Sequence, residues 1–207
     1  MTGSAQKQDF VPELLGRSDY AIIGEIVEPR TKVLDLGCGE GELLQWLAEH
    51  KGVDARGVEI SSVKVQRAIG RGVSVFQSDI DEGLADYPDH AFDYVILSQT
   101  LQETRHPRQV LREMLRVGRR GIVAFPNFGH WRVRLSMLVS GRAPRTSLFP
   151  YEWYESPNIH FLTVHDFEDL AGKEGLTVER RYFLAGRRKV GRLPNLSAEV
   201  AVFLVRR

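Results

Sequence analysis

The chain has one cysteine, no long apolar run and almost no net charge, and each shortage excludes a class of protein. A lone Cys38 excludes an intrachain disulfide and a thiolate metal cluster, and we predict no bound metal. The apolar runs fall short of the roughly 18 residues that a membrane-spanning helix needs, so no membrane partner is expected. The N-terminus has no apolar secretory segment, which predicts the cytoplasm as the compartment.

The composition is that of a globular protein. Hydrophobic residues make up 43% of the 207 positions, enough for one sizeable core, and predict one domain over residues 1–207. The formal net charge is +1. Residues 1–8 are polar and are expected to fray.

The most informative stretch is an apolar run, residues 33–36, that ends in alternating glycines at positions 37, 39 and 41. Such a run predicts a buried parallel strand, and glycines at its end let the backbone approach a ligand closely. A helical pattern follows over residues 43–47. Cys38, inside the turn, is interpreted as a small buried residue rather than a nucleophile.

The glycine spacing excludes two common kinds of ligand site. Gly-x-Gly-x-Gly differs from the dinucleotide fingerprint and from the phosphate-binding P-loop, and no lysine follows to neutralise a phosphate. Asp35, in the strand just before the turn, suits a ligand ammonium. The alternative is a tight turn that binds nothing. The segment resembles motif I of the class I S-adenosylmethionine-dependent methyltransferases, which implies S-adenosylmethionine or S-adenosylhomocysteine as the ligand, with Asp35 facing its amino group.

Polar groups end the next strands as well. Glu59, at the end of a predicted strand over residues 55–60, lies about 20 residues beyond the glycines, where an acid can accept both ribose hydroxyls; the alternative is a surface acid. Ser61 and Ser62 follow as a predicted helix N-cap.

A third strand, residues 73–77, runs into Asp79 and Ile80. The resemblance implies that Asp79 accepts from the adenine amino group and that Ile80 packs on the ring. Asp81 is the competing acid, with a turn cap as its other role. A fourth strand, residues 92–97, ends at Ser98 and Gln99. The predicted cofactor-binding residues are Asp35, Gly37, Cys38, Gly39, Glu59, Ile60, Asp79, Ile80, Ser98 and Gln99.

The rest of the chain predicts an α/β fold with a mostly parallel sheet, because strands alternate with helices. Helices are predicted over residues 20–27 and 108–117, and a strand over 121–125. Residues 163–166 predict a capping box that opens the last main helix. Closing strands are predicted near 176–184 and 199–205. The resemblance implies a Rossmann-like class I methyltransferase fold, with seven strands and an antiparallel C-terminal strand.

An insertion, residues 126–162, lies outside this plain scaffold. It is rich in aromatic residues, which concentrate in pockets and interfaces. A satellite core under a long loop is the alternative. Ten arginines face one acid, Glu113, between Arg105 and Arg145, and such a surface can bind nucleic acid, an acidic protein or an anionic acyl carrier. A solvated helix face accounts for Arg108, Arg112 and Arg116, and because the net charge is low we expect nucleic-acid binding to be weak.

Longer strings indicate a more specific family than motif I does. They are residues 92–102, 125–135, 150–154 and 157–160. They are similar to the MetW family of methionine biosynthesis, and the likeness runs from about Arg17 to Leu184. The resemblance implies a partnership with the homoserine O-acyltransferase MetX, whose activity the chain would support. The residues predicted to bind the partner are Trp131, Arg132, Arg134, Trp153 and Tyr154.

An active small-molecule methyltransferase is the alternative function. Methyl transfer to a protonated acceptor needs a base, and the candidates are His130, His160, Glu103 and His106. Each of these residue types more often serves packing or the surface. In this alternative the insertion is a lid over the acceptor rather than an interface.

Overall fold

The computed structural model describes residues 17–207, so the prediction for residues 1–8 lies outside it. The strands are β1 (Lys32–Leu36), β2 (Asp54–Glu59), β3 (Ser74–Gln77), β4 (Phe92–Ser98), β5 (Gly118–Pro126), β6 (Thr177–Ala185), β7 (Arg188–Lys189) and β8 (Val200–Arg206). The helices are α1 (Ser18–Ile26), α2 (Glu42–Lys51), α3 (Ser62–Gly70), α4 (Pro107–Val117), α5 (Trp131–Ser140), α6 (Val164–Lys173) and α7 (Pro194–Ser197), with short 3₁₀ turns η2 (Ile80–Glu82) and η3 (Leu101–Glu103).

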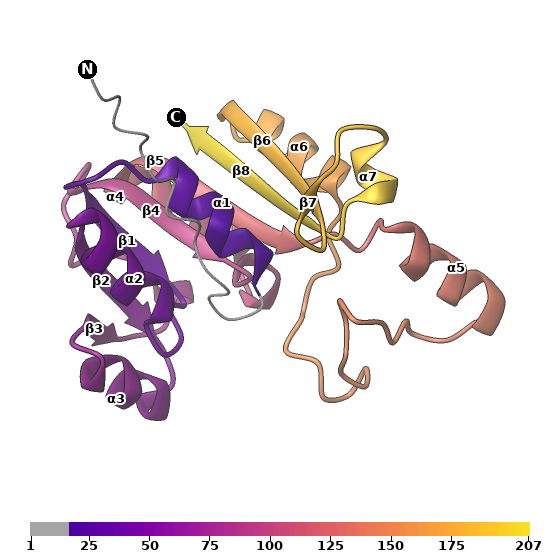
Figure 1. Ribbon diagram of the computed structural model, residues 1–207, viewed down its shortest axis with the longest axis horizontal. Helices are drawn as coiled ribbons and strands as arrows, with labels where there is room; N and C mark the ends of the chain where they lie inside the picture. The colour runs from indigo at the N-terminus through magenta and orange to yellow at the C-terminus, as the bar shows by residue number, and fades with distance from the viewer. Residues whose placement is uncertain (1–16) are drawn as a thin grey trace, which may run out of the picture.

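One sheet orders these strands β3-β2-β1-β4-β5-β8-β6-β7 (Figure 1). The strands from β3 to β5 pair in parallel, and β8 runs antiparallel between β5 and β6. The predicted α/β class, the mostly parallel sheet and the antiparallel C-terminal strand are confirmed. The eighth strand, the two-residue β7, extends the edge beyond the seven predicted.

The two faces of the sheet carry separate apolar clusters, because successive strand side chains point to opposite faces. On one face Leu34, Leu97 and Phe125 join residues of α4 and α6. On the other, Val33 and Ile96 join residues of α1 and α2. Asp35 and Ser98 continue the second alternation, which directs both side chains toward the α1 side at the carboxyl ends of β1 and β4.

The chain order reverses between β1 and β4. From β1 the chain moves outward to β2 and β3, and it then returns to β4 on the other side of β1. Ligands of open α/β sheets bind in the crevice at such a reversal, outside the carboxyl ends of the strands. The glycine turn after β1 lies at this edge.

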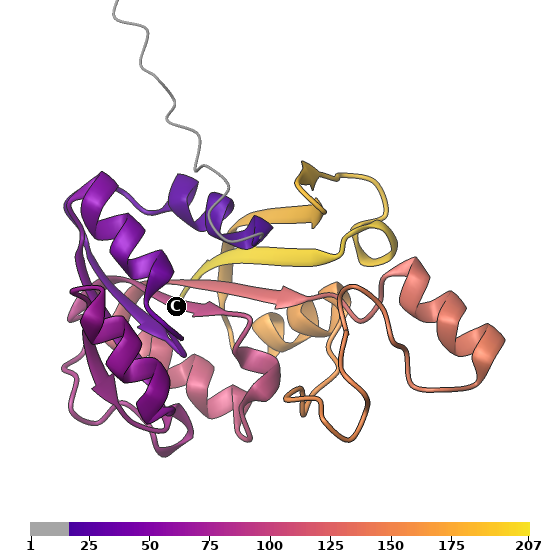
Figure 2. The same cartoon turned by 60° about the horizontal axis from the view of Figure 1, so that its bottom comes forward.

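The insertion leaves the sheet after β5, and both views show α5 far from the helices that cover the sheet (Figures 1 and 2). Its two ends are joined where the Phe128 amide donates to the Leu162 carbonyl at 3.1 Å. The Phe128 ring packs against Phe161 and Phe149, with centroids 4.6 and 5.3 Å away. A small satellite core thus anchors the insertion, as the alternative interpretation expected for part of its aromatics.

Two helix starts test the capping predictions. The predicted box at α6 is confirmed, because Thr163 and Asp166 exchange side-chain and backbone hydrogen bonds. Ser61 occupies the N-cap position of α3, but its side chain makes no capping bond there.

Among the described helices, none is long and apolar enough to cross a membrane.

Candidate functional site

The glycine turn after β1 is built from left-handed backbone. Gly37, Gly39 and Gly41 have φ angles of +76°, +59° and +77°, a region that favours glycine. A Cβ on Gly37 would lie 2.6 Å from the Thr100 side chain, whereas a Cβ on Gly39 would meet no atom within 4 Å. Gly37 is therefore needed for packing, and the backbone at Gly39 faces open space that a ligand can fill.

Glu59 fastens this turn to the end of β2. One carboxylate oxygen accepts from the Gly39 amide at 2.9 Å, and the other accepts from the Ser61 amide at 2.9 Å. The residue is 5% exposed, so the surface-acid interpretation is wrong. Its carboxylate keeps further lone pairs, because each oxygen can accept more than one hydrogen bond.

Asp35 is the most unusual residue at this edge. It is 3% exposed, and its Oδ1 atom finds no hydrogen-bond partner among the described residues. Burial raises the pKa of this carboxyl to about 7, although the positive charge of Arg17 acts in the opposite direction. A buried acceptor without a donor is costly, so this atom is available to a hydrogen-bond donor.

A buried network beside Asp35 was missed at the level of sequence. Arg17 donates to Asp19 at 2.7 Å and to the Ser98 hydroxyl at 2.7 Å, and that hydroxyl donates to Asp19 at 2.5 Å. Ser98 therefore stands where predicted, at the carboxyl end of β4, and connects β4 to the start of α1. The next residue, Gln99, has a φ of +59°, a strained conformation of the kind that clusters at functional sites.

The predicted adenine end lies after β3. The Asp79 side chain accepts from the Asp81 amide and caps η2, while Asp81 accepts from the amides of Arg105 and His106 at 2.8 and 2.9 Å. Asp81 therefore fastens the loop after η3. Ile80 is half-buried, and Ile60, 62% exposed, offers an open apolar surface at the end of β2.

Cys38 points away from the open side of the turn. A Cβ built on Gly57 would collide with the Cys38 sulfur, so the thiol packs over β2. The residue is 5% exposed, and burial raises the pKa of the thiol. This agrees with the interpretation as a small buried residue. The Cys38 amide donates to the Val58 carbonyl and its carbonyl accepts from the Gly41 amide, both at 3.1 Å, so its backbone helps to hold the turn.

The four candidate bases have different surroundings. Glu103, His106 and His160 are exposed. Although Glu103 is exposed overall, partial burial of its carboxyl raises its pKa, while the nearby Lys64 lowers this pKa and Glu59 raises it further. His130 is 3% exposed, burial lowers its pKa, and its Nδ1 atom has no partner among the described residues. The structure does not gather these four groups into one cluster of hydrogen bonds.

The residues predicted to bind a partner lie on the insertion and face solvent. Trp131 is 46% exposed and Trp153 75% exposed. Tyr154 packs edge-on against Trp153, with centroids 5.5 Å apart. Arg132 lies over the Trp131 ring, and Arg134 donates to the Gly129 carbonyl. These tryptophans therefore lie outside the satellite core.

Most arginines of the basic stretch are paired with acids. The paired residues are Arg108, Arg112, Arg116, Arg119, Arg120, Arg132 and Arg145. Arg116 also donates to the carbonyls of Leu84 and Tyr87, so it fastens a loop rather than forming a free helix face.

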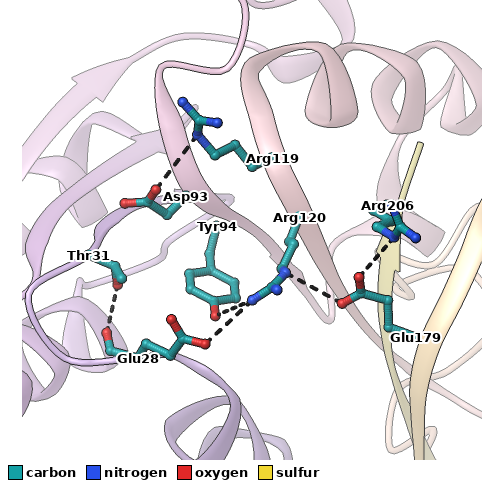
Figure 3. A pocket seen from close by; sticks show the side chains of 8 residues that line it. All are labelled: Glu28, Thr31, Asp93, Tyr94, Arg119, Arg120, Glu179 and Arg206. Atoms are coloured by element: carbon teal, nitrogen blue, oxygen red, sulfur yellow. Dashed lines mark hydrogen bonds and ion pairs between the residues drawn. The ribbon is translucent and has the colours of Figure 1, made fainter.

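A pocket of about 420 Å³ lies at the opposite end of the sheet, at the starts of β4 and β5 (Figure 3). Arg120 spans it, donating to the Tyr94 hydroxyl at 3.1 Å and pairing with Glu28 and Glu179. Its charges neutralise one another, which makes it a stabilising network at the amino ends of the strands.

Sequence comparison connects the chain with methionine biosynthesis. The sequence profile of the family described as "Methionine biosynthesis protein MetW" matches residues 17–205. The bifunctional methionine biosynthesis protein MetXA/MetW of Rhodopirellula baltica is 35% identical over 205 residues, covering 91% of this chain and 32% of that protein. The chain thus spans about a third of the length of this relative.

Solved structures share the fold at low identity. An S-adenosylmethionine-dependent methyltransferase from Mesorhizobium loti has a TM-score of 0.70 and 15% identity, covering 94% of this chain and 100% of that one. A possible histamine N-methyltransferase from Thermotoga maritima has a TM-score of 0.64 and 19% identity, covering 92% and 90%. The fold is therefore the Rossmann-like methyltransferase fold, which hosts many functions.

Proposed function

Because the chain belongs to the MetW family of methionine biosynthesis proteins, we propose that it binds S-adenosylmethionine or S-adenosylhomocysteine and acts as a partner of the homoserine O-acyltransferase MetX. The observation that carries the first part is the buried Oδ1 of Asp35, without a partner among the described residues, at the edge where Gly39 faces open space. S-adenosylmethionine, when bound, supplies an activated methyl group on a sulfonium.

The residues present fit such a ligand. Asp35 would accept from the methionyl ammonium, and the Gly39 backbone would lie against the methionyl chain. Glu59, already fixed by two amides, would accept from the ribose hydroxyls. Asp79 would accept from the adenine amino group, with Ile80 packed on the ring. Together these residues supply acceptors for the donors at both ends of the ligand.

Calorimetry with S-adenosylhomocysteine tests the cofactor assignment. Glu59→Gln should weaken binding by roughly 1.5–3 kcal/mol, the range for a hydrogen bond to a charged group. Glu179→Gln is the matched control, because Glu179 pairs with Arg120 and Arg206 at the opposite end of the sheet. Equal affinities for both variants would contradict the role given to Glu59.

The partner role rests on the insertion and on the relative. The bifunctional protein carries both names in one chain, which supports an association. Exposed Trp and Tyr residues, such as Trp153 and Tyr154, are the types that dominate interface hot spots. We place the MetX contact on this surface, with Trp131, Arg132 and Arg134 beside it.

Co-purification with MetX, followed by its acyltransferase activity with and without this chain, tests the partnership. Trp153→Ala should cost about 2 kcal/mol or more in partner affinity and leave S-adenosylhomocysteine affinity unchanged. Loss of cofactor affinity with partner binding intact would support the lid interpretation instead. A variant that unfolds would place Trp153 in the satellite core and contradict its role as an anchor.

An active methyltransferase is the second candidate, and His130 is the observation that favours it. Its lowered pKa keeps the imidazole neutral near pH 7, the form that can accept a proton. Its Nδ1 atom is closed off from solvent, so an acceptor would reach it only after the insertion moves. We therefore rank the partner role first, and single-turnover methyl transfer that is lost in His130→Gln would reverse the order.

A further inference from the structure

The segment between β4 and α4 lies between the insertion and the carboxyl edge of the sheet that carries the proposed cofactor site. We call this edge the cofactor edge. Gln102 is 3% exposed, and its side-chain amide donates to the Gln99 carbonyl at 2.7 Å. Its own backbone carbonyl accepts from the amides of Ile159 and His160, at 2.9 and 3.0 Å. One buried residue thus holds both the turn after β4 and the returning limb of the insertion, residues 157–162.

The other side of the same turn forms part of the cofactor edge. The Thr100 side chain occupies the place that a Cβ on Gly37 would need. Glu103 is close enough to Glu59 for the two charges to interact. Gln99 is held at a φ of +59° while its amide donates to the Ala124 carbonyl at 2.8 Å. A turn under this much constraint has little freedom to absorb a displacement locally.

The side chain of Gln102 is only partly satisfied by hydrogen bonds. The Oε1 atom is buried and has no partner among the described residues, which costs free energy. The returning limb is also only partly packed, because Phe161 contacts Phe128 but remains 57% exposed, and Ile159 is 54% exposed. Weakly packed segments with few buried apolar contacts open at low free energy and are the ones that respond to a ligand.

We propose that residues 99–103 couple the cofactor edge to the insertion, so that a bound S-adenosyl compound orders the returning limb, with Gln102 as the positioning residue. This rests on the proposed function of the edge. A ligand against the glycine turn restrains Thr100 and Gln99, and the Gln102 carbonyl then holds the amides of Ile159 and His160 more persistently. Because coupling is reciprocal, ordering of the limb raises ligand affinity in turn.

The consequence is regulation of the exposed insertion surface. The returning limb carries Phe161 onto Phe128 and follows the segment that bears Trp153 and Tyr154. A partner bound there would sense whether the cofactor site is filled, without contacting the cofactor itself. Such a response requires that the ligand prefer the ordered state of the limb.

Amide hydrogen exchange on the whole chain, with and without saturating S-adenosylhomocysteine, tests the coupling. The amides of Ile159 and His160 should exchange about fivefold or more slowly with the ligand, the size of a typical coupling. Gln102→Met keeps the side-chain volume and removes the amide, and it should abolish the ligand effect on these two amides while the ligand still binds. Gln109→Met, on the exposed face of α4, should keep the full effect.

A second variant covers the case in which Gln102→Met fails to fold. Ile159→Pro removes one donor to the Gln102 carbonyl, because proline has no amide hydrogen, and should weaken the ligand's protection of His160. Binding without any change in exchange at positions 159 and 160 would overturn the coupling and leave the proposed function intact. No binding by the native chain would overturn the proposed function first.

Discussion

Among single residues, Asp35 is the strongest evidence for a ligand at the carboxyl edge of the sheet. A carboxyl whose pKa rises from 3.8 to about 7 on folding binds its proton more tightly in the folded state than in the unfolded chain. The ionised form therefore destabilises the fold, by an amount that is absent below pH 4 and grows until the pH passes the folded pKa. A protein keeps such a group when something other than stability requires it.

Asp35→Asn should for this reason stabilise the fold in a pH-dependent way. The stability of the variant relative to the native chain should increase by about 2–3 kcal/mol between pH 5 and pH 8, because the native protein loses stability over that range. Urea unfolding at the two pH values measures it. A difference between variant and native chain that does not change with pH would show that the Asp35 carboxyl is not perturbed.

The sequence was sufficient for the residues that belong to local patterns. Gly37, Gly39, Asp35 and Glu59 stand at the edge where their spacing placed them, because each follows directly from the end of a strand. Arg17 and Asp19 could not be predicted, since their partner Ser98 lies about 80 positions away in the chain. A hydrogen bond over that separation exists only once β4 and α1 have packed together.

Among the helices and strands, the sequence predicted those in which buried residues recur at a regular spacing. The buried strands alternate between two packed faces, and their bounds lie close to those expected. Two elements were too short for any period to appear, β7 with two residues and α7 with four. Helix α5 was not predicted because its apolar residues do not share a buried face. Among its residues Val133 alone is buried, while Leu138 is 82% exposed.

The exposed face of α5 leads to a prediction about the partner. Leu138→Ser should change the free energy of unfolding, measured by thermal denaturation, by no more than about 0.5 kcal/mol, because an exposed side chain contributes little to packing. It should weaken MetX binding if α5 forms part of the interface. Ile69→Ser on α3, another exposed aliphatic residue, is the control and should not affect MetX binding. Equal MetX affinities for the two variants would remove α5 from the interface.

At the scale of the whole molecule, charge pairing changes the meaning of the basic stretch. The sequence shows ten arginines against one acid between Arg105 and Arg145, yet acids from distant segments pair with most of them. Nucleic-acid binding should accordingly be weak and should fall steeply with salt. A tight, sequence-dependent complex at physiological salt, seen in a filter-binding titration, would favour an RNA methyltransferase.

The charged pocket at the far end of the sheet should affect stability and not binding. Arg120→Met breaks the contacts to Tyr94, Glu28 and Glu179, and it should lower the free energy of unfolding by about 1 kcal/mol or less, since the pairs are partly exposed. Arg188→Met, at a position without an ion pair to any described residue, should have a smaller effect. S-adenosylhomocysteine affinity should be the same in both variants, and a selective loss in Arg120→Met would link this pocket to the ligand.

If the glycine turn after β1 holds an S-adenosyl ligand, a matched pair of glycine variants should differ in ligand binding and not in backbone strain. Gly39 and Gly175 both have positive φ, +59° and +67°, and a Cβ at either would meet no atom within 4 Å. Gly39→Val and Gly175→Val should therefore cost similar backbone strain, about 1–2 kcal/mol each.

Calorimetry with S-adenosylhomocysteine should show binding to the native chain and to Gly175→Val, and none to Gly39→Val, whose side chain would fill the ligand's place. Equal binding by the two variants, or no heat from the native chain at millimolar ligand, would show that this turn is not an S-adenosyl site.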